Sequence, residues 1–193
     1  MSDNKLNRVG LLPKIFPDHK KFLYVTGLAG PARDAAALTD DGDNMYTMSG
    51  CMGAATCTGL GMALAAPDRE VCVIAGDGEL MMNIGSLATV ATQAPKNLTI
   101  CIVDNGGHGE TGGQPGHTAI YTDLGKVAEG MGLKNVMVVT SEDQVADAAK
   151  FVASGEGPRF LVLRVAVGDP TNYKRNFNGA ECRVRFREAF LNG

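Results

Sequence analysis

The sequence lacks the patterns that mark several large classes of protein. Its five cysteines include no C-x-x-C pair, and we expect reduced thiols, with Cys72 and Cys101 buried inside strands of a cytoplasmic protein. The formal net charge is only −3, so nothing indicates a nucleic-acid or membrane footprint. No stretch approaches 18 consecutive apolar residues, and the polar start MSDNKLNR is not typical of a signal peptide.

Motifs of common enzyme classes are also missing. The sequence holds no G-x-S-x-G elbow, H-E-x-x-H pair or Walker A lysine motif, so hydrolase and nucleotide-triphosphatase activities have no support. The run 107–112 fits G-x-G-x-x-G after a strand, as in dinucleotide-binding folds. That fingerprint must open directly into a helix, whereas Gly113, Pro115 and Gly116 follow it at once. We therefore set nicotinamide binding aside.

What the sequence does contain is a regular alternation of apolar strands and helices. With 45% hydrophobic residues in 193, it is long enough to bury one full core. The pattern predicts an α/β domain built on a parallel sheet with helices on both faces. The expected strands are 22–26, 44–48, 71–75, 98–103, 135–139 and 159–167; the expected helices are 5–18 (interrupted by Pro13), 32–38, 52–66, 80–93, 122–131, 141–154 and 181–191, with a glycine-rich loop at 105–120.

Two polar positions follow neighbouring strands of this predicted sheet. Gly76-Asp77-Gly78 follows the run VCVI, and Asn105, separated from Gly78 by 26 residues, follows the run LTICIV. Asp77 and Asn105 should therefore emerge side by side at the carboxyl ends of parallel strands, where open α/β sheets bind ligands. A carboxylate, an amide oxygen and a nearby backbone carbonyl suit Mg²⁺, which usually also takes phosphate oxygens. The flanking glycines let a phosphate approach the backbone, and a helix starting near Leu80 would point its N–H groups at it.

This spacing resembles the thiamine-diphosphate signature, a GDG followed about two dozen residues later by Asn. The segment from Ser49 to Thr118 is similar to the diphosphate-binding domain of sulfopyruvate and phosphonopyruvate decarboxylases, and TGGQP (Thr111–Pro115) points to that branch. The similarity continues more weakly to about residue 167. The resemblance implies one domain over 1–193 that binds thiamine diphosphate and Mg²⁺, with the segments 1–20 and 170–193 less well matched.

The resemblance also implies roles for individual residues. Asp77, Asn105 and the carbonyl of Gly107 would ligate the metal. Met52 would support the bent cofactor, and Gly50 would offer a carbonyl to its pyrimidine amino group. The cofactor-binding set would comprise Gly50, Met52, Gly76, Asp77, Gly78, Glu79, Asn105, Gly107 and Thr111, with the N–H groups of Gly78 and Glu79 on the diphosphate. Glu79 departs from the small residue usual there, and its charge requires it to turn away from the diphosphate, for instance toward a partner chain.

The glycine-rich loop supplies the candidate catalytic residues. His108, Glu110 and His117 are ionisable side chains on a loop above the expected cofactor, where proton donors are useful. A solvated surface histidine is the plainer interpretation of each. Relatives often have an apolar and aromatic pair where this chain has Gly107-His108. Arg33 is one candidate for clamping an anionic substrate group, and a solvated helix residue is the alternative.

The implied activity is decarboxylation of sulfopyruvate or phosphonopyruvate to an aldehyde and CO2. In this family a glutamate on a second domain activates the cofactor, and about 40 residues before the second strand are too few to encode that domain. We therefore expect a β subunit, active with an α subunit that carries the pyrimidine-binding domain, in an α2β2 or higher assembly. Alternatives are a non-catalytic or regulatory subunit, a carboligase or plain 2-oxoacid decarboxylase, and a fragment of a longer chain. For the polar patch Thr171–Asn178, we expect a solvated tail rather than a cover for a partner.

Overall fold

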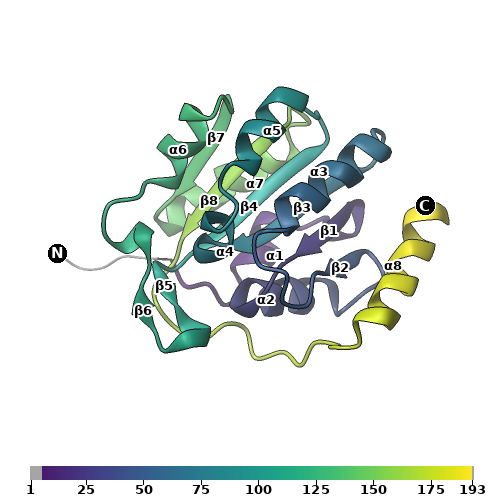
Figure 1. Cartoon of the computed structure of the whole chain (residues 1–193), viewed down its shortest axis with the longest axis horizontal. Helices are drawn as coiled ribbons and strands as arrows, with labels where there is room; N and C mark the ends of the chain where they lie inside the picture. The colour runs from purple at the N-terminus through teal and green to yellow at the C-terminus, as the bar shows by residue number, and fades with distance from the viewer. Residues whose placement is uncertain (1–5, 193) are drawn as a thin grey trace.

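The chain forms a six-stranded parallel sheet between two layers of helices (Figure 1). The computed structural model describes residues 6–192. The strand order is β2-β1-β3-β4-β8-β7, and every neighbouring pair is parallel. The predicted α/β class is confirmed. The strands are β1 (Phe22–Thr26), β2 (Met45–Thr47), β3 (Glu70–Gly76), β4 (Leu98–Asp104), β7 (Asn135–Val139) and β8 (Arg159–Arg164).

Helices bury both faces of this sheet, which explains why its central strands are apolar throughout rather than alternating. Every residue of β1 and β4 is buried, including Cys101, and Cys72 is buried in β3 as predicted. One face packs on α1 (Leu11–Ile15), α2 (Ala29–Thr39) and α7 (Val145–Ala153); the other packs on α3 (Ala55–Ala65), α5 (Ser86–Gln93) and α6 (Leu124–Gly130). The small residues of α3 allow close contact, since a Cβ on Gly59 would lie 2.2 Å from Val73 Cγ2.

The order of the strands determines where a ligand can bind. From β1 the chain moves outward to β2, then crosses back to β3 and continues in the opposite direction to β4. The connections therefore diverge at the carboxyl ends of β1 and β3, which leaves a crevice between the loops at that edge. The turn Gly27–Pro31 after β1 and residues 76–79 after β3 form two sides of this crevice.

The predicted helix 80–93 is wrong as a single element. It is two helices, α4 (Asp77–Met81) and α5, separated by a turn at 82–85. Asn83 and Gly85 occupy this turn; both disfavour a helix interior, and Asn83 Nδ2 donates instead to the carbonyl of Gly53 at 3.0 Å. The first helix begins at Asp77 rather than near Leu80, so Asp77 belongs to the first turn of α4.

Three other predictions need correction. The expected helix 5–18 is only α1, with a 3₁₀ turn at His19–Lys21, and residue 5 lies outside the described residues. Pro13 does not interrupt it but sits in its first turn, where no N–H is needed. The glycine-rich loop contains a short hairpin of β5 (Gly107–His108) and β6 (Gln114–Pro115) and two 3₁₀ turns (Gly109–Thr111 and His117–Ala119), and the G-x-G-x-x-G run leads into strand β6 rather than into an α-helix. Strand β8 ends at Arg164 rather than 167.

The expectation of a solvated tail is wrong. After β8 the chain runs along the sheet past α2 and reaches α8 (Gly179–Asn192) beside the edge strand β2 (Figure 1). Arg175 is 6% exposed and donates to Thr47 Oγ1 at 3.2 Å. The N–H of Thr171 donates to Asp34 Oδ1 at 2.8 Å. The hydroxyl of Tyr173 and the N–H of Asn176 likewise donate to Asp40 and Asp41, directly after α2, so carboxylates of this chain hold the tail against it. No helix within residues 6–192 is long and apolar enough to cross a membrane.

Candidate active site

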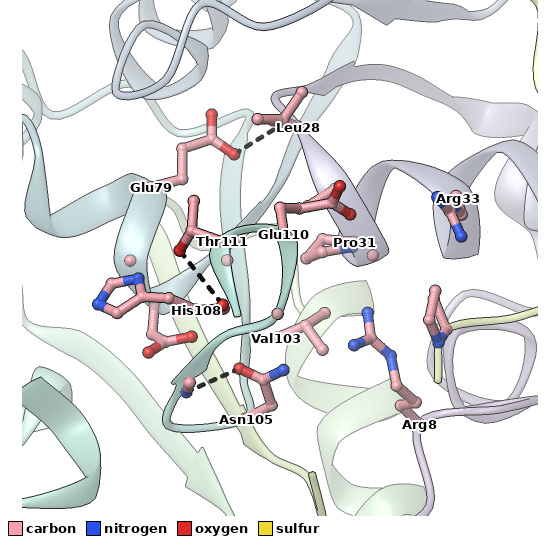
Figure 2. Close-up of a pocket in the computed structure, with 18 of the residues that line it drawn as sticks. Arg8, Leu28, Pro31, Arg33, Glu79, Val103, Asn105, His108, Glu110 and Thr111 are labelled. Atoms are coloured by element: carbon pink, nitrogen blue, oxygen red, sulfur yellow. Dashed lines mark hydrogen bonds between the residues drawn. The ribbon is translucent and has the colours of Figure 1, made fainter. Parts of the chain in front are cut away.

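The structure brings Asp77 and Asn105 to the same cavity, at the carboxyl ends of β3 and β4. The two strands are paired up to Gly76 and Val103, so the residues that follow them emerge at one edge of the sheet. Both side chains line a cavity of about 450 Å³, together with the turn after β1 and the hairpin loop (Figure 2). Gly168, Asp169 and Pro170 of the tail also line it.

Asp77 belongs to a buried polar chain that sequence reasoning missed. Its side chain is 3% exposed, and its Oδ2 lies 3.0 Å from the hydroxyl of Thr118. The same hydroxyl lies 2.7 Å from Asp104 Oδ1, and Arg164 Nε lies 3.3 Å from Asp104 Oδ2. A hydroxyl has one proton and can donate to only one of these carboxylates at a time. The N–H of Gly106 also donates to Asp104 Oδ1, at 3.1 Å, so Asp104 has partners of its own and Asp77 is the carboxylate that remains for a cation.

Burial raises the pKa of Asp77 above its ordinary value, and the negative charge of Asp104 adds to this effect. The hydrogen bond from Thr118 acts in the opposite direction. Both causes are ones that a bound cation would offset, because it favours the ionised carboxylate. Within residues 6–192, no three His, Cys, Asp or Glu side chains gather as a metal cluster. The expected site is of another kind, with one carboxylate, one amide oxygen and one backbone carbonyl.

The loop after β4 places Asn105 and Gly107 beside Asp77. Asn105 Oδ1 accepts a hydrogen bond from the N–H of Gly107 at 3.1 Å, which closes a local turn. The N–H of Gly116 donates to the carbonyl of Gly106 at 2.7 Å, and a Cβ on Gly116 would lie 3.1 Å from Asp77 Oδ2. Glycine at 116 therefore lets the returning strand of the hairpin pass directly over the carboxylate.

Glu79 turns toward its own chain rather than toward a partner. It is 5% exposed, and its Oε2 accepts from the N–H of Leu28 at 3.2 Å (Figure 2). Its carboxylate occupies the space beside Gly27, where a Cβ would overlap it at 1.7 Å. Burial raises the pKa of Glu79 from 4.5 to about 7, against the opposing effect of backbone donors, among which Leu28 contributes most.

The candidate catalytic residues divide between the cavity and its surroundings. His108 and Glu110 line the cavity, as does Thr111, whose hydroxyl lies 3.2 Å from Gln114 Oε1. The ring of His108 lies against Gly78, because a Cβ there would be 3.0 Å from two of its ring atoms. His117 is exposed and does not line the cavity; its ring centroid is 6.5 Å from that of His108.

Met52 and Gly50 lie on the loop between β2 and α3. Met52 is 40% exposed and lines the cavity, so an apolar side chain is available at its mouth. Gly50 does not line the cavity, and its φ of 105° is a conformation that favours glycine.

Two arginines complete the cavity. For Arg33 the sequence left two interpretations open, a clamp for an anionic substrate group and a solvated helix residue. The structure places Arg33 in the lining of the cavity, to which Arg8 also belongs. Nothing in the sequence pointed to Arg8, Thr118 or Asp104. The one available signal was that Asp104 directly precedes Asn105 at the end of an apolar run.

A doubly wound parallel sheet with an Asp–Asn pair at the ends of adjacent central strands defines a class, the cofactor-binding α/β domains whose ligands bind at the carboxyl edge. The particular family follows from comparison. Residues 32–163 match the model of the thiamine pyrophosphate enzymes' C-terminal TPP binding domain. The chain belongs to this family.

Several curated relatives carry decarboxylase names. The chain is 37% identical over 137 residues to the sulfopyruvate decarboxylase subunit beta of Methanocaldococcus jannaschii, covering 70% of this chain and 72% of the relative. It is 35% identical over 181 residues to the phosphonopyruvate decarboxylase of Streptomyces viridochromogenes, covering 93% of this chain but 45% of the relative. The chain thus spans less than half the length of that relative.

Solved structures agree on the fold. A thiamine diphosphate-dependent 4-hydroxybenzoylformate decarboxylase of Rhodococcus jostii RHA1 superposes with a TM-score of 0.67 at 22% identity, over 88% of this chain and 34% of that one. A thiamin diphosphate-dependent enzyme from Mycobacterium smegmatis gives 0.64 at 18% identity, over 81% and 31%. At these identities the likeness concerns the fold alone.

Proposed function

We propose that this chain is the cofactor-binding β subunit of a thiamine-diphosphate-dependent decarboxylase that converts sulfopyruvate or phosphonopyruvate to an aldehyde and CO2. The names of the relatives support this substrate class, and three relatives named as beta subunits are covered over 72%, 88% and 84% of their length. The observation that carries the proposal is the pair of Asp77 and Asn105 facing one cavity at the ends of β3 and β4.

The residues present fit the cofactor. Asp77, Asn105 and the carbonyl of Gly107 would hold Mg²⁺, and the N–H groups of Gly78 and Glu79 in the first turn of α4 would hold diphosphate oxygens. When bound, thiamine diphosphate supplies a nucleophilic carbon and then an electron sink for decarboxylation. This chain would orient the reactants: Met52 would give apolar support at the mouth, and His108, which lines the cavity, would donate a proton.

The rest of the catalytic site would come from a partner. The glutamate that activates the cofactor would lie on an α subunit carrying the pyrimidine-binding domain, and the complete site would form between the subunits of an α2β2 or larger assembly. We place the enzyme in the cytoplasm, in keeping with the free buried thiols of Cys72 and Cys101.

Calorimetric titration of thiamine diphosphate with Mg²⁺ tests the proposal. We expect weak or absent binding by this chain alone and tight binding together with its α subunit. Asp77→Asn should weaken the Mg²⁺-dependent binding at least about tenfold, because it replaces a charged ligand. Asp68→Asn, the same change at an exposed position, is the matched control.

Two results would contradict the proposal. Unchanged cofactor affinity in Asp77→Asn would remove the metal site. Absence of binding by the complex of wild-type subunits would leave the fold without its cofactor, and a non-catalytic role would replace the decarboxylase.

A further inference from the structure

The cavity has a cationic side that the cofactor-binding residues do not use. Arg8, from the segment before α1, and Arg33, from the first half of α2, both line the cavity. Figure 2 shows the two arginines on one side of the view, with His108 on the other and Asn105 between them. Both arginines therefore belong to the wall of the cavity that also holds Asp77 and Asn105.

Arg8 is fixed in place with part of its guanidinium unused. Its Nε and Nη2 donate to Asp34 Oδ2 at 3.0 and 2.6 Å, and its side chain is buried. Gly30 permits this position, since a Cβ there would lie 2.4 Å from Arg8 Nη2. Nη1 takes part in neither hydrogen bond with Asp34, and the residue still lines the cavity. Arg8 thus offers a preorganised donor edge at low entropic cost.

Arg33 is the exposed cation of the pair. It lines the cavity, and within residues 6–192 it forms no ion pair at 4.0 Å or less. Burial lowers the pKa of Arg175, and the positive charge of Arg33 adds to this effect, so the two guanidinium groups repel each other. Glu110 and Asp169 also line the cavity, so its cationic side is local rather than general. A ligand group here must itself be anionic to replace these carboxylates beside the guanidinium groups.

We propose that Arg33, with the free Nη1 edge of Arg8, binds the second acidic group of the substrate and so selects 2-oxo acids that end in a sulfonate or phosphonate. This inference rests on the proposed function and names the residue that determines its specificity. The planar guanidinium fork matches tetrahedral oxyanions such as sulfonate and phosphonate in two parallel hydrogen bonds. A methyl-ended 2-oxo acid makes no such contact.

The test is kinetic, on the assembled enzyme with its α subunit. Arg33→Gln should raise KM for sulfopyruvate or phosphonopyruvate about tenfold to a hundredfold, the loss expected for a hydrogen bond between charged groups. Arg33→Lys should recover part of this loss, because it restores the charge without the fork. Arg183→Gln, the same change on the exposed face of α8, should leave KM unchanged.

A binding measurement tests the contact between Arg33 and the second acidic group without requiring turnover. Titration of 2-hydroxy-3-sulfopropanoate, which has both acidic groups but no ketone, into the assembled enzyme should show about tenfold weaker binding in Arg33→Gln. Lactate, which lacks the second acid, should bind wild type and variant equally. Equal losses for both compounds, or no loss for either, would overturn the inference.

Cofactor affinity separates this inference from the proposed function. Thiamine diphosphate should bind Arg33→Gln as tightly as wild type. If its affinity falls along with that of the sulfonate, Arg33 acts on the diphosphate, and the specificity role is wrong. The wild-type assembly could bind the cofactor and decarboxylate 2-oxo acids while Arg33→Gln binds the sulfonate as tightly as wild type. In that case the inference fails and the proposed function stands.

Discussion

Glu79 is an ionisable residue that the fold buries, although its charged form is more stable in water. A glutamate with 5% exposure loses most of its hydration, and the backbone donors around it, of which the N–H of Leu28 contributes most, replace only part of it. Its Oε1 is buried and has no hydrogen-bond partner within the described residues. The carboxyl therefore retains its proton to about pH 7.

This burial predicts a pH-dependent stability in the metal-free chain. Because the pKa is raised on folding, the folded state binds more protons than the unfolded state between about pH 4.5 and 7, and stability falls as the pH rises through that range. Glu79→Gln keeps an acceptor for Leu28 without the charge. Above pH 7 it should be more stable than wild type by up to about 3 kcal/mol, with little difference near pH 4.5.

Urea unfolding at several pH values, with EDTA present, measures this difference. Glu188→Gln, at an exposed position on α8, is the control and should follow the wild-type curve. Parallel curves for wild type and Glu79→Gln would mean that Glu79 titrates normally.

At the residue scale, sequence spacing was informative only for residues next to the ends of strands. Asp77 and Asn105 follow apolar runs directly, so their position at the edge of the sheet follows from the position of those runs. Thr118 gives no such signal, because it lies 41 residues from the Asp77 carboxylate that it contacts. The orientation of Glu79 was also undetermined, since its partner Leu28 lies 51 residues away.

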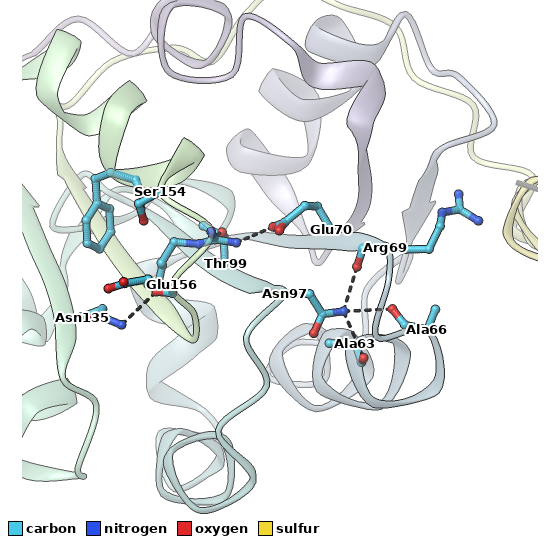
Figure 3. Close-up of polar contacts among 11 residues, drawn as sticks. Ala63, Ala66, Arg69, Glu70, Asn97, Thr99, Asn135, Ser154 and Glu156 are labelled. Atoms are coloured by element: carbon cyan, nitrogen blue, oxygen red, sulfur yellow. Dashed lines mark hydrogen bonds and ion pairs between the residues drawn. The ribbon is translucent and has the colours of Figure 1, made fainter.

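At the scale of elements, one buried amide joins helix α3 to the strands that follow it. Asn97, 7% exposed, places its Nδ2 at 3.1, 2.9 and 2.7 Å from the carbonyl oxygens of Ala63, Ala66 and Arg69 (Figure 3). The last carbonyls of a helix have no partner within it. The two N–H groups of the Asn97 amide are shared among these three carbonyls, of which that of Ala63 belongs to the last turn of α3, and they fix the helix against the start of β4.

We expect Asn97→Ala to lower the free energy of unfolding by about 2 kcal/mol, because it leaves buried carbonyls without donors. Asn135→Ala is the matched control, since Asn135 Nδ2 also donates to a backbone carbonyl, that of Glu156 at 2.8 Å, but at an exposed site (Figure 3). That variant should lose less than about 1 kcal/mol. Equal losses in denaturant unfolding would show that burial of the Asn97 amide adds nothing.

Element types were predictable where hydrophobic periodicity was strong. Strands β1 and β7 begin and end at the expected residues because their apolar runs are bounded by turn-forming residues. The division of 80–93 into α4 and α5 was missed, since a helical pattern of apolar residues continues across it. The contact of Asn83 with Gly53, thirty residues earlier, stabilises the turn, and local periodicity contains no information on such a contact.

For the molecule as a whole, the tail covers the edge of the sheet at strand β2. Helix α8 lies beside β2, and the ring of Phe186 is 5.5 Å from that of Tyr46 and 6.2 Å from that of Phe190. On the way, residues 168–170 line the cavity. The tail therefore both covers an edge strand and forms part of the candidate site.

Phe186→Ala should destabilise the chain by about 3 kcal/mol, because it removes a buried aromatic side chain from this contact. Phe177→Ala is the control in the same tail; its ring is 68% exposed and stacks on Arg175 at 4.6 Å, so we expect a loss below about 1 kcal/mol. Thermal unfolding and limited proteolysis of the tail would measure both. Rapid cleavage of wild type at 168–178 would contradict a packed tail.

The sequence by itself determined the parallel α/β class and the meeting of Asp77 with Asn105, because both depend on short-range patterns: apolar strand runs and the residues directly after them. Only the tertiary structure decided the shared hydroxyl of Thr118, the burial of Glu79 beside Gly27 and the position of Arg8 against Asp34. Each of these contacts joins residues far apart in the chain. Their geometry depends on how the loops pack around the edge of the sheet, and side-chain type and spacing do not encode that packing locally.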